Sequence, residues 1–159
     1  MASVDVAGAV AVMVVLTLSF QCAGMGVLIH WGRSRFAGGL HRLGAFRSAV
    51  LMVRFSSIIV VIHGLQILLW AWFYRWNCFS SWELALYFST ASYSTAGAAD
   101  LLLPQKWRIL GAAESVTGVL MCGFSASFIF AVMTRLVSQE ARFSPGLAWP
   151  TGRETVLEK

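Results

Sequence analysis

The segment YSTAGAAD, residues 93–100, decides the fold of this chain. It consists of small and hydroxylated residues with a glycine at position 97 and an acid at position 100, a composition typical of turns. Long apolar segments flank it on both sides. Irregular backbone at membrane depth is tolerated only inside protein or along a water-filled cavity. If this segment enters a membrane, it therefore needs other protein around it.

The apolar residues form long runs instead of alternating with polar ones. The 159-residue chain is 58% hydrophobic and 12% charged, far more apolar than an ordinary soluble domain. Residues 6–29 and 55–74 carry no formal charge, and residues 109–133 carry one, Glu114. Each run reaches the roughly 20 residues that a helix needs to cross the hydrocarbon core. The composition predicts an all-α integral membrane protein with three transmembrane helices.

Basic residues collect at the edges of these runs, so the net charge of +5 does not indicate nucleic-acid binding. The positive-inside rule predicts that the connection between the first two runs is cytoplasmic. The N-terminus is then outside, residues 75–106 are outside again, and the C-terminal tail is cytoplasmic. The arginines between the first two runs are Arg33, Arg35, Arg42, Arg47 and Arg54.

Residues 80–94, SSWELALYFSTASYS, predict a short helix before the loop. Ser81 is a suitable N-cap, and Glu83 in the first turn favours the helix dipole. A helix of about a dozen residues is too short to cross a bilayer and is typical of a re-entrant segment. We therefore expect the chain to dip into the membrane, turn through the loop and return to the outer face.

Helix, re-entrant half-helix, small-residue loop and helix resemble the pore module of the potassium-channel superfamily, over about residues 47–136. Tyr87 and Phe88 stand at the aromatic pair of the family's pore helix. The family filter is T-V-G-Y-G-D, and the resemblance implies that four such loops line one cation pathway. The residues at the filter positions here are Thr95, Ala96, Gly97, Ala98, Ala99 and Asp100.

The loop departs from the family pattern at its alanines. A left-handed backbone at Ala99 would cost about 1 kcal/mol or more per subunit, and Ala98 lacks the side chain that braces the filter. A wider or differently folded filter with weak potassium selectivity is expected. Thr95 and a fourfold ring of Asp100 would still attract cations. The alternative is that these two residues only cap the half-helix and the turn.

The apolar runs and the resemblance together predict an organisation in four parts. Residues 1–31 form an additional N-terminal transmembrane helix, residues 32–47 a basic connection that is either an interfacial helix or a plain loop, and residues 138–159 a polar cytoplasmic tail. The pore module spans residues 48–137. Its parts are the outer helix 48–76, the pore helix 82–94, the filter 95–100 and the inner helix 108–137.

Glu114 is an acid inside the last apolar run, and intramembrane acids suggest a function by default. Lying behind the filter, it would hydrogen-bond the pore helix through Tyr93 or Ser92 and brace the loop. The alternative is a proton-sensitive gate. His63 and Gln66 lie three residues apart on one helix face, where interhelical hydrogen bonding is the simpler expectation.

Two features of the last run suggest a hinge or gate. Gly118 lies near the family's hinge glycine, although close helix packing explains a glycine there equally well. Phe124 and Phe128, with Phe130, form either a hydrophobic constriction that closes by dewetting or a lipid-facing surface. An aromatic belt at the headgroups is expected from Trp70, Trp72, Tyr74, Trp76 and Trp82.

Other classes of function find no support in the sequence. The three cysteines, Cys22, Cys78 and Cys122, show no metal-binding spacing, and neither a catalytic residue set nor a phosphate loop is present. No metal, cofactor or enzyme activity is expected beyond a permeant monovalent cation such as potassium or sodium. The sequence predicts a homotetrameric cation channel in the bilayer, and the resemblance to prokaryotic members implies the bacterial inner membrane. The alternative is a non-conducting channel-fold scaffold or auxiliary subunit, and the tail's protein partner is unknown.

Overall fold

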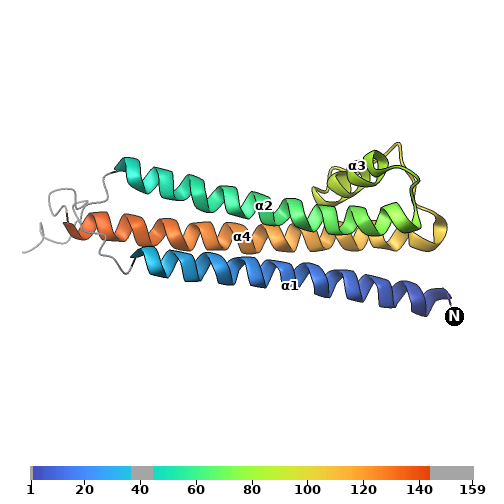
Figure 1. Ribbon diagram of the computed structural model, residues 1–159, viewed down its shortest axis with the longest axis horizontal. Helices are drawn as coiled ribbons and strands as arrows, with labels where there is room; N and C mark the ends of the chain where they lie inside the picture. The colour runs from blue at the N-terminus through green and yellow to red at the C-terminus, as the bar shows by residue number, and fades with distance from the viewer. Residues whose placement is uncertain (1, 37–44, 144–159) are drawn as a thin grey trace, which may run out of the picture.

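Three long helices lie side by side and form the body of the protein (Figure 1). The computed structural model describes residues 2–36 and 45–143, and these ranges contain helices and loops without strands. The long helices are α1 (Ala2–Phe36), α2 (Ala45–Asn77) and α4 (Arg108–Phe143). The predicted all-α fold class is confirmed.

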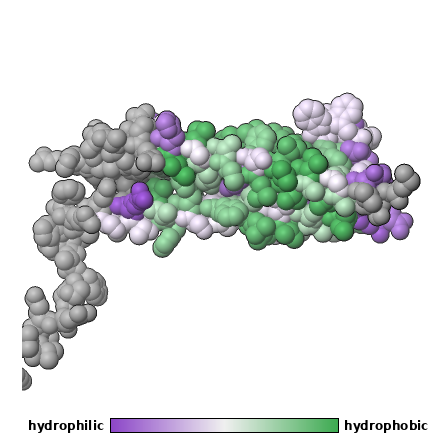
Figure 2. All heavy atoms as spheres, turned by 90° about the horizontal axis from the view of Figure 1, so that it is seen from below, coloured by the Kyte–Doolittle hydropathy of each residue, from purple (hydrophilic) through white to green (hydrophobic). Residues whose placement is uncertain are grey.

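Each long helix contains a segment that is long and apolar enough to cross a membrane: Asp5–Gly32, Ala49–Asn77 and Gln105–Arg135. Figure 2 shows a broad hydrophobic band over the middle of one face and more hydrophilic residues towards the ends. Large apolar side chains in these segments, such as Val60 and Phe130, are exposed. Such a surface is stable only against lipid or further protein, so the chain is a membrane protein.

A short helix, α3 (Trp82–Tyr93), lies beside α2 at the end of the bundle where the N-terminus is found (Figure 1). Its N-cap is Ser81, whose hydroxyl accepts a hydrogen bond of 3.2 Å from the Glu83 amide, as the sequence predicts. Irregular backbone follows α3 and leads into the 3₁₀ helix η1 (Gln105–Trp107). The short helix is therefore held between two long ones with the loop at its end.

The interior contains two apolar clusters. The one beside α3 includes Trp70, Tyr74, Phe88 and Leu110, with the rings of Tyr74 and Phe88 edge to face at 5.1 Å. The other lies nearer the opposite end of the bundle and includes Leu28, Phe55, Ile59 and Ile62. α1 packs against both α2 and α4, so it is part of the bundle's core.

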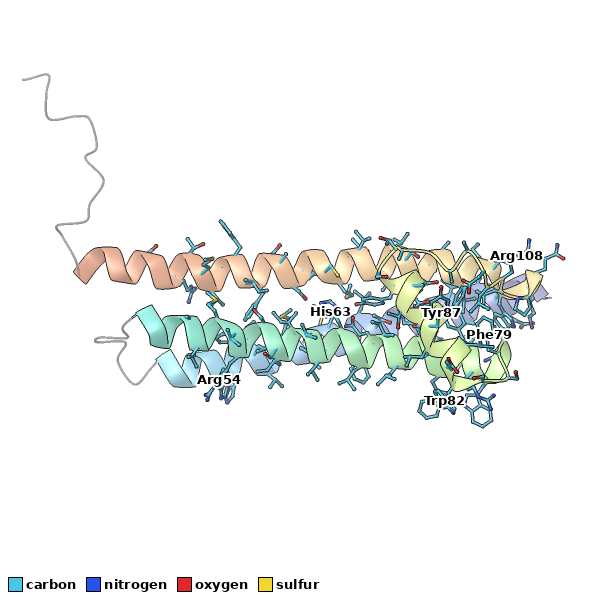
Figure 3. All side chains as sticks on the ribbon, turned by 90° about the horizontal axis from the view of Figure 1, so that it is seen from above. Arg54, His63, Phe79, Trp82, Tyr87 and Arg108 are labelled. Carbon is cyan, nitrogen blue, oxygen red and sulfur yellow. The ribbon has the colours of Figure 1, made fainter. Side chains whose placement is uncertain are left out.

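The prediction of an aromatic belt at the headgroups is wrong for two of its five residues. Trp70 and Tyr74 are fully buried because both donate hydrogen bonds inside the bundle, to Thr17 and Glu114 respectively. Trp72, Trp76 and Trp82 are largely exposed, and Figure 3 shows Trp82 pointing away from the bundle.

Two predicted segments lie partly outside the described residues. Within the basic connection, residues 37–44 are not described, so the interfacial-helix hypothesis falls outside the structure there. In the tail, α4 continues to Phe143, and residues 144–159 are not described.

Candidate ion-conduction site

The loop begins with a tight turn at the end of α3. Ser94 is the C-cap of the helix, and Thr95 follows with φ 61°, the left-handed conformation that commonly ends helices. The Thr95 amide donates to the Ser92 carbonyl at 3.0 Å, and the Gly97 amide donates to the Ala91 carbonyl at 3.0 Å. These bonds satisfy carbonyls at the helix end and fold the loop back against it.

Backbone strain in the loop falls on Thr95 instead of Ala99. Within the described ranges, Thr95 is the one non-glycine residue with a positive φ, and Gly97 has φ 76°. A β-branched residue in this region is an outlier. Ala99 does not adopt a left-handed backbone, because the positive φ angles of the loop are at Thr95 and Gly97.

The other end of the loop, at Asp100, is also attached to α3. The Tyr87 hydroxyl donates a hydrogen bond of 3.1 Å to Oδ1 of Asp100. Both side chains are exposed, and this hydrogen bond raises the pKa of the Tyr87 phenol. Residues 95–100 therefore form a short arc that is tied to the same helix at both ends.

A hollow of about 400 Å³ lies between α3, the loop and α4. Ala98 and Gly111 contribute only small groups to its wall, so the space behind the loop is incompletely filled. Other lining residues are Phe88, Ser92, Thr95, Gly97, Leu101, Leu102, Leu103, Arg108, Ala112 and Ser115.

Glu114 is fully buried, and each of its carboxyl oxygens receives one hydrogen bond. Ser89 of α3 donates to Oε1 at 2.6 Å, and Tyr74 of α2 donates to Oε2 at 2.8 Å. A buried carboxyl group needs such partners, because leaving it without them costs several kcal/mol, on the order of the desolvation of a polar group. Glu114 thus connects α4 to both α3 and α2.

The expected partners of Glu114, Tyr93 and Ser92, make other contacts. The Ser92 carbonyl accepts a hydrogen bond of 2.7 Å from the Ser115 hydroxyl. The Tyr93 hydroxyl contacts Gln66 and His63. The partner of Glu114 on α3 is instead Ser89, which lies one helical turn before Ser92 on the same face of the helix.

Gly118 marks the closest approach of α4 to the end of α3. A Cβ atom at this position would lie 2.2 Å from the Tyr93 carbonyl oxygen, and α4 continues through Gly118 without interruption. Close packing, one of the two interpretations of this glycine, accounts for its presence.

The two candidate gate phenylalanines have different surroundings. Phe124 is 56% exposed, whereas Phe128 is partly buried and packs edge to face on Phe55, with 5.9 Å between ring centroids. Phe128 is therefore engaged with α2, and Phe124 and Phe130 are the members of the set that face outward.

With α2, α3, the loop and α4 in this order, the chain can be compared with known families. Residues 52–135 match the family model described as ion channel, which is more than half of the 159-residue chain. The chain belongs to this ion-channel family. No curated protein and no solved structure gives a significant match to it.

The match covers the part of the channel that carries the site. It begins in α2 and ends in α4, so it includes the short helix, the loop and Glu114, whereas α1 lies outside it. Membership of this family supports a transport protein instead of an enzyme.

The part of the channel that the structure describes contains no group of three or more His, Cys, Asp or Glu side chains that could hold a metal ion. Its three cysteines are free thiols.

Several residues of the site did not stand out in the sequence. Ser89, Tyr74 and Ser115 are ordinary in composition, and only their position beside an intramembrane acid or a helix end gives them a role. Thr17 and Gln21 lie four residues apart in the first apolar run. This spacing puts both polar side chains on one helix face, a pattern that indicates a face packed against other helices.

Proposed function

We propose that this ion channel is a homotetrameric pore for monovalent cations, with residues 95–100 as its filter and with weak selectivity for potassium. The observation that carries the proposal is the attachment of the loop to α3 at both ends, at Ala91 and Ser92 on one side and at Tyr87 on the other. Between these attachments the loop is largely exposed in one subunit. One such arc cannot enclose an ion, so several copies around an axis are required.

The charges around the loop favour cations. The C-terminal end of α3 points its partly negative dipole towards the loop, and Asp100 stands at the other end of the arc. Repeated in each subunit, Asp100 would form an acidic ring at the mouth and concentrate cations there.

Weak selectivity follows from the way the loop is supported. A hollow of about 400 Å³ adjoins the loop at Gly97 and Ala98, and the methyl group of Ala98 fills little of it, so we expect the loop to be able to adapt its width. A filter that can widen replaces the hydration shell of potassium and of sodium similarly well, whether selection depends on cavity size or on ligand number.

The proposed orientation places α3 and the N-terminus at the outer face and Arg54 at the cytoplasmic face. α3 and the N-terminus lie at the same end of the bundle (Figure 1), while Arg54 lies towards the opposite end (Figure 3). The positive-inside rule then gives a cytoplasmic C-terminus. A bacterial inner membrane is the compartment that we assign to it.

The test is cation flux into liposomes that contain the purified channel, with potassium, sodium and N-methyl-D-glucamine compared. We expect potassium and sodium to pass at similar rates and Asp100→Asn to reduce both. Glu83→Gln is the matched control, because it removes an equally exposed acid at the other end of α3. Flux of potassium alone would contradict weak selectivity, and equal flux in Asp100→Asn and wild type would contradict the acidic mouth.

Two observations favour a second candidate, a non-conducting scaffold with the channel fold. The hollow behind the loop and the left-handed Thr95 would allow the filter to collapse in an assembly. Absence of flux at every pH, voltage and lipid composition tested would support the scaffold.

A further inference from the structure

Five polar side chains from four helices form a closed ring of hydrogen bonds inside the bundle: Gln21 of α1, His63 and Gln66 of α2, Tyr93 of α3 and Ser125 of α4. Figure 3 shows His63 between α2 and α4. The ring is the place at which all four helices exchange side-chain hydrogen bonds, and its position is within the membrane-spanning part of the chain.

The contacts follow one another without a gap. Nδ1 of His63 lies 2.8 Å from the Tyr93 hydroxyl, which donates to Oε1 of Gln66. Nε2 of Gln66 donates to Oε1 of Gln21 at 2.9 Å. Nε2 of Gln21 donates to Oγ of Ser125 at 3.0 Å, and Nε2 of His63 lies 2.9 Å from the same oxygen.

The chemistry of these groups fixes the direction of each bond. An amide oxygen can only accept, so the Tyr93 hydroxyl donates to Gln66 and accepts from Nδ1–H of His63. Nε2 of the neutral imidazole is then the acceptor, and Ser125 donates to it. Each side chain donates once and accepts once, in the same sense around the ring, an arrangement in which hydrogen bonds polarise and strengthen one another.

Removing one member of the ring affects the others. Gln21, Gln66, Tyr93 and Ser125 are all buried, and neither water nor lipid is available to replace a lost partner in such surroundings. A buried polar group without a partner costs more than the net value of the bond that it lost. The ring therefore holds its four helices in one relative position.

Tyr93 brings the ring next to the filter. It is the last residue of α3, its carbonyl oxygen packs against Gly118, and the left-handed Thr95 is only two residues further along the chain. The hydroxyl that fixes this residue is held by Gln66, which in turn is held by Gln21.

A second set of hydrogen bonds joins α1 and α2 one helical turn away from Gln21 and Gln66. Nε1 of Trp70 donates to the Thr17 hydroxyl at 3.0 Å, and Nε2 of Gln66 also lies 3.4 Å from the Thr17 carbonyl. α1 is thus attached to α2 directly beside the residues that hold Tyr93.

We infer that Gln21 is a positioning residue for the filter, so that α1, which lies outside the family match, sets the ion selectivity of this channel through the ring. The hydrogen bonds of Gln21 go to Gln66 and Ser125 and not to the loop. It acts by fixing Gln66 and Ser125, and through them the inner end of α3. The effect on selectivity rests on the proposed function, whereas the effect on the loop does not.

The experiment compares Gln21→Met with wild type and with Ser19→Ala in lipid nanodiscs. Methionine nearly conserves the volume of glutamine but makes no comparable hydrogen bond, and volume-conserving changes are tolerated best. Ser19 is exposed and bonds only along its own helix, to the Val15 carbonyl, so it is the matched control on α1. Size-exclusion chromatography verifies that each variant keeps the wild-type assembly.

Amide hydrogen exchange of residues 94–101 is the first readout. In Gln21→Met we expect it to accelerate by roughly fivefold or more, as the loss of one net hydrogen bond allows, and in Ser19→Ala to stay at the wild-type rate. Unchanged exchange in Gln21→Met overturns the inference. If Gln21→Met does not assemble, Ser125→Ala is measured in its place, because it removes another member of the ring. Faster exchange of residues 94–101 then supports the inference, and unchanged exchange overturns it.

The ratio of potassium to sodium flux, measured with the same three proteins in liposomes, is the second readout. A ratio that changes in Gln21→Met and stays constant in Ser19→Ala supports the role in selectivity, and a ratio that is constant in both overturns that role. If wild type conducts no ion, the proposed function fails. The exchange measurement still decides whether Gln21 positions the loop.

Discussion

The carboxyl group of Glu114 in the inner helix accepts a hydrogen bond of 2.6 Å from the hydroxyl of Ser89 in the short helix. The same hydroxyl lies 2.9 Å from the Ile67 carbonyl of α2, so it has a second acceptor available. This double contact means that the short helix is held from both sides, and it determines which substitutions of Glu114 the channel tolerates.

Glu114→Gln should preserve the fold, whereas Glu114→Leu should not. In the glutamine variant the Ser89 hydroxyl donates to Ile67 and accepts from the new amide, and Tyr74 still donates to the amide oxygen. In the leucine variant the Ser89 hydroxyl keeps the Ile67 carbonyl as acceptor, whereas the buried Tyr74 hydroxyl loses its acceptor, at a cost of about 1–3 kcal/mol. Thermal unfolding of the purified assembly measures the difference, and equal losses in the two variants would show that these hydrogen bonds do not stabilise the bundle.

Gly118→Ala should displace the end of α3. The added methyl would overlap the Tyr93 carbonyl oxygen, which is backbone and cannot rotate away, and overpacking of this kind costs about 1–3 kcal/mol. The melting temperature and the cation flux are both expected to fall.

Gly123→Ala is the control for this prediction, because a Cβ atom there meets nothing within 4 Å. Alanine is the better helix former by about 1 kcal/mol, so this variant should be at least as stable as wild type. A Gly118→Ala variant that keeps its melting temperature and loses only gating would instead support the hinge interpretation.

Much of the fold could be predicted from the sequence because its determinants are local. The length and hydropathy of each run are enough to predict a spanning helix, and Ser81 followed by Glu83 predicts the start of the short helix. These features depend on neighbouring residues alone, and the structure has the helices where these patterns lie.

The contacts of the site depend on how each helix is rotated about its own axis, and hydropathy does not specify this rotation when a helix is apolar on every face. Ser89 and Ser92 differ by about one turn, yet only Ser89 meets Glu114. The burial of Trp70 was missed for the same reason, since its partner Thr17 is on a helix distant in sequence. No local pattern would have brought Gln21 and Ser125 together.

Cys78 should react slowly with iodoacetamide at neutral pH. It follows α2 outside the membrane-spanning segment, and burial raises the pKa of its thiol to about 11. The thiolate is the reactive form, so a raised pKa lowers its fraction at pH 7, and the rate should increase by about tenfold per pH unit until the pH approaches that pKa. A Cys22→Ala, Cys122→Ala background isolates this residue.

A peptide cysteine in the same vesicles is the reference, since its rate levels off near its ordinary pKa of about 8.5. If the rate of Cys78 levels off at that pH as well, the thiol is not buried and the packing of residues 77–79 differs from that described.

Tyr87→Phe and Asp100→Asn should be coupled in their effect on cation flux. Phenylalanine removes the 3.1 Å hydrogen bond that ties Asp100 to the short helix, and asparagine removes the charge that the bond orients. Phenylalanine removes the donor, and asparagine replaces the carboxylate with a neutral amide that accepts a weaker hydrogen bond. Because both changes weaken the same contact, the double variant should lose less than the sum of the two single losses, with a coupling of about 0.5–3 kcal/mol. Flux of wild type, the two single variants and the double variant at one salt concentration gives the cycle. Ser19→Ala combined with Asp100→Asn is the control pair, because Ser19 bonds only along its own helix α1, so the losses should add. Additive losses in the Tyr87 and Asp100 cycle would mean that the hydrogen bond does not hold the outer end of the filter when ions pass.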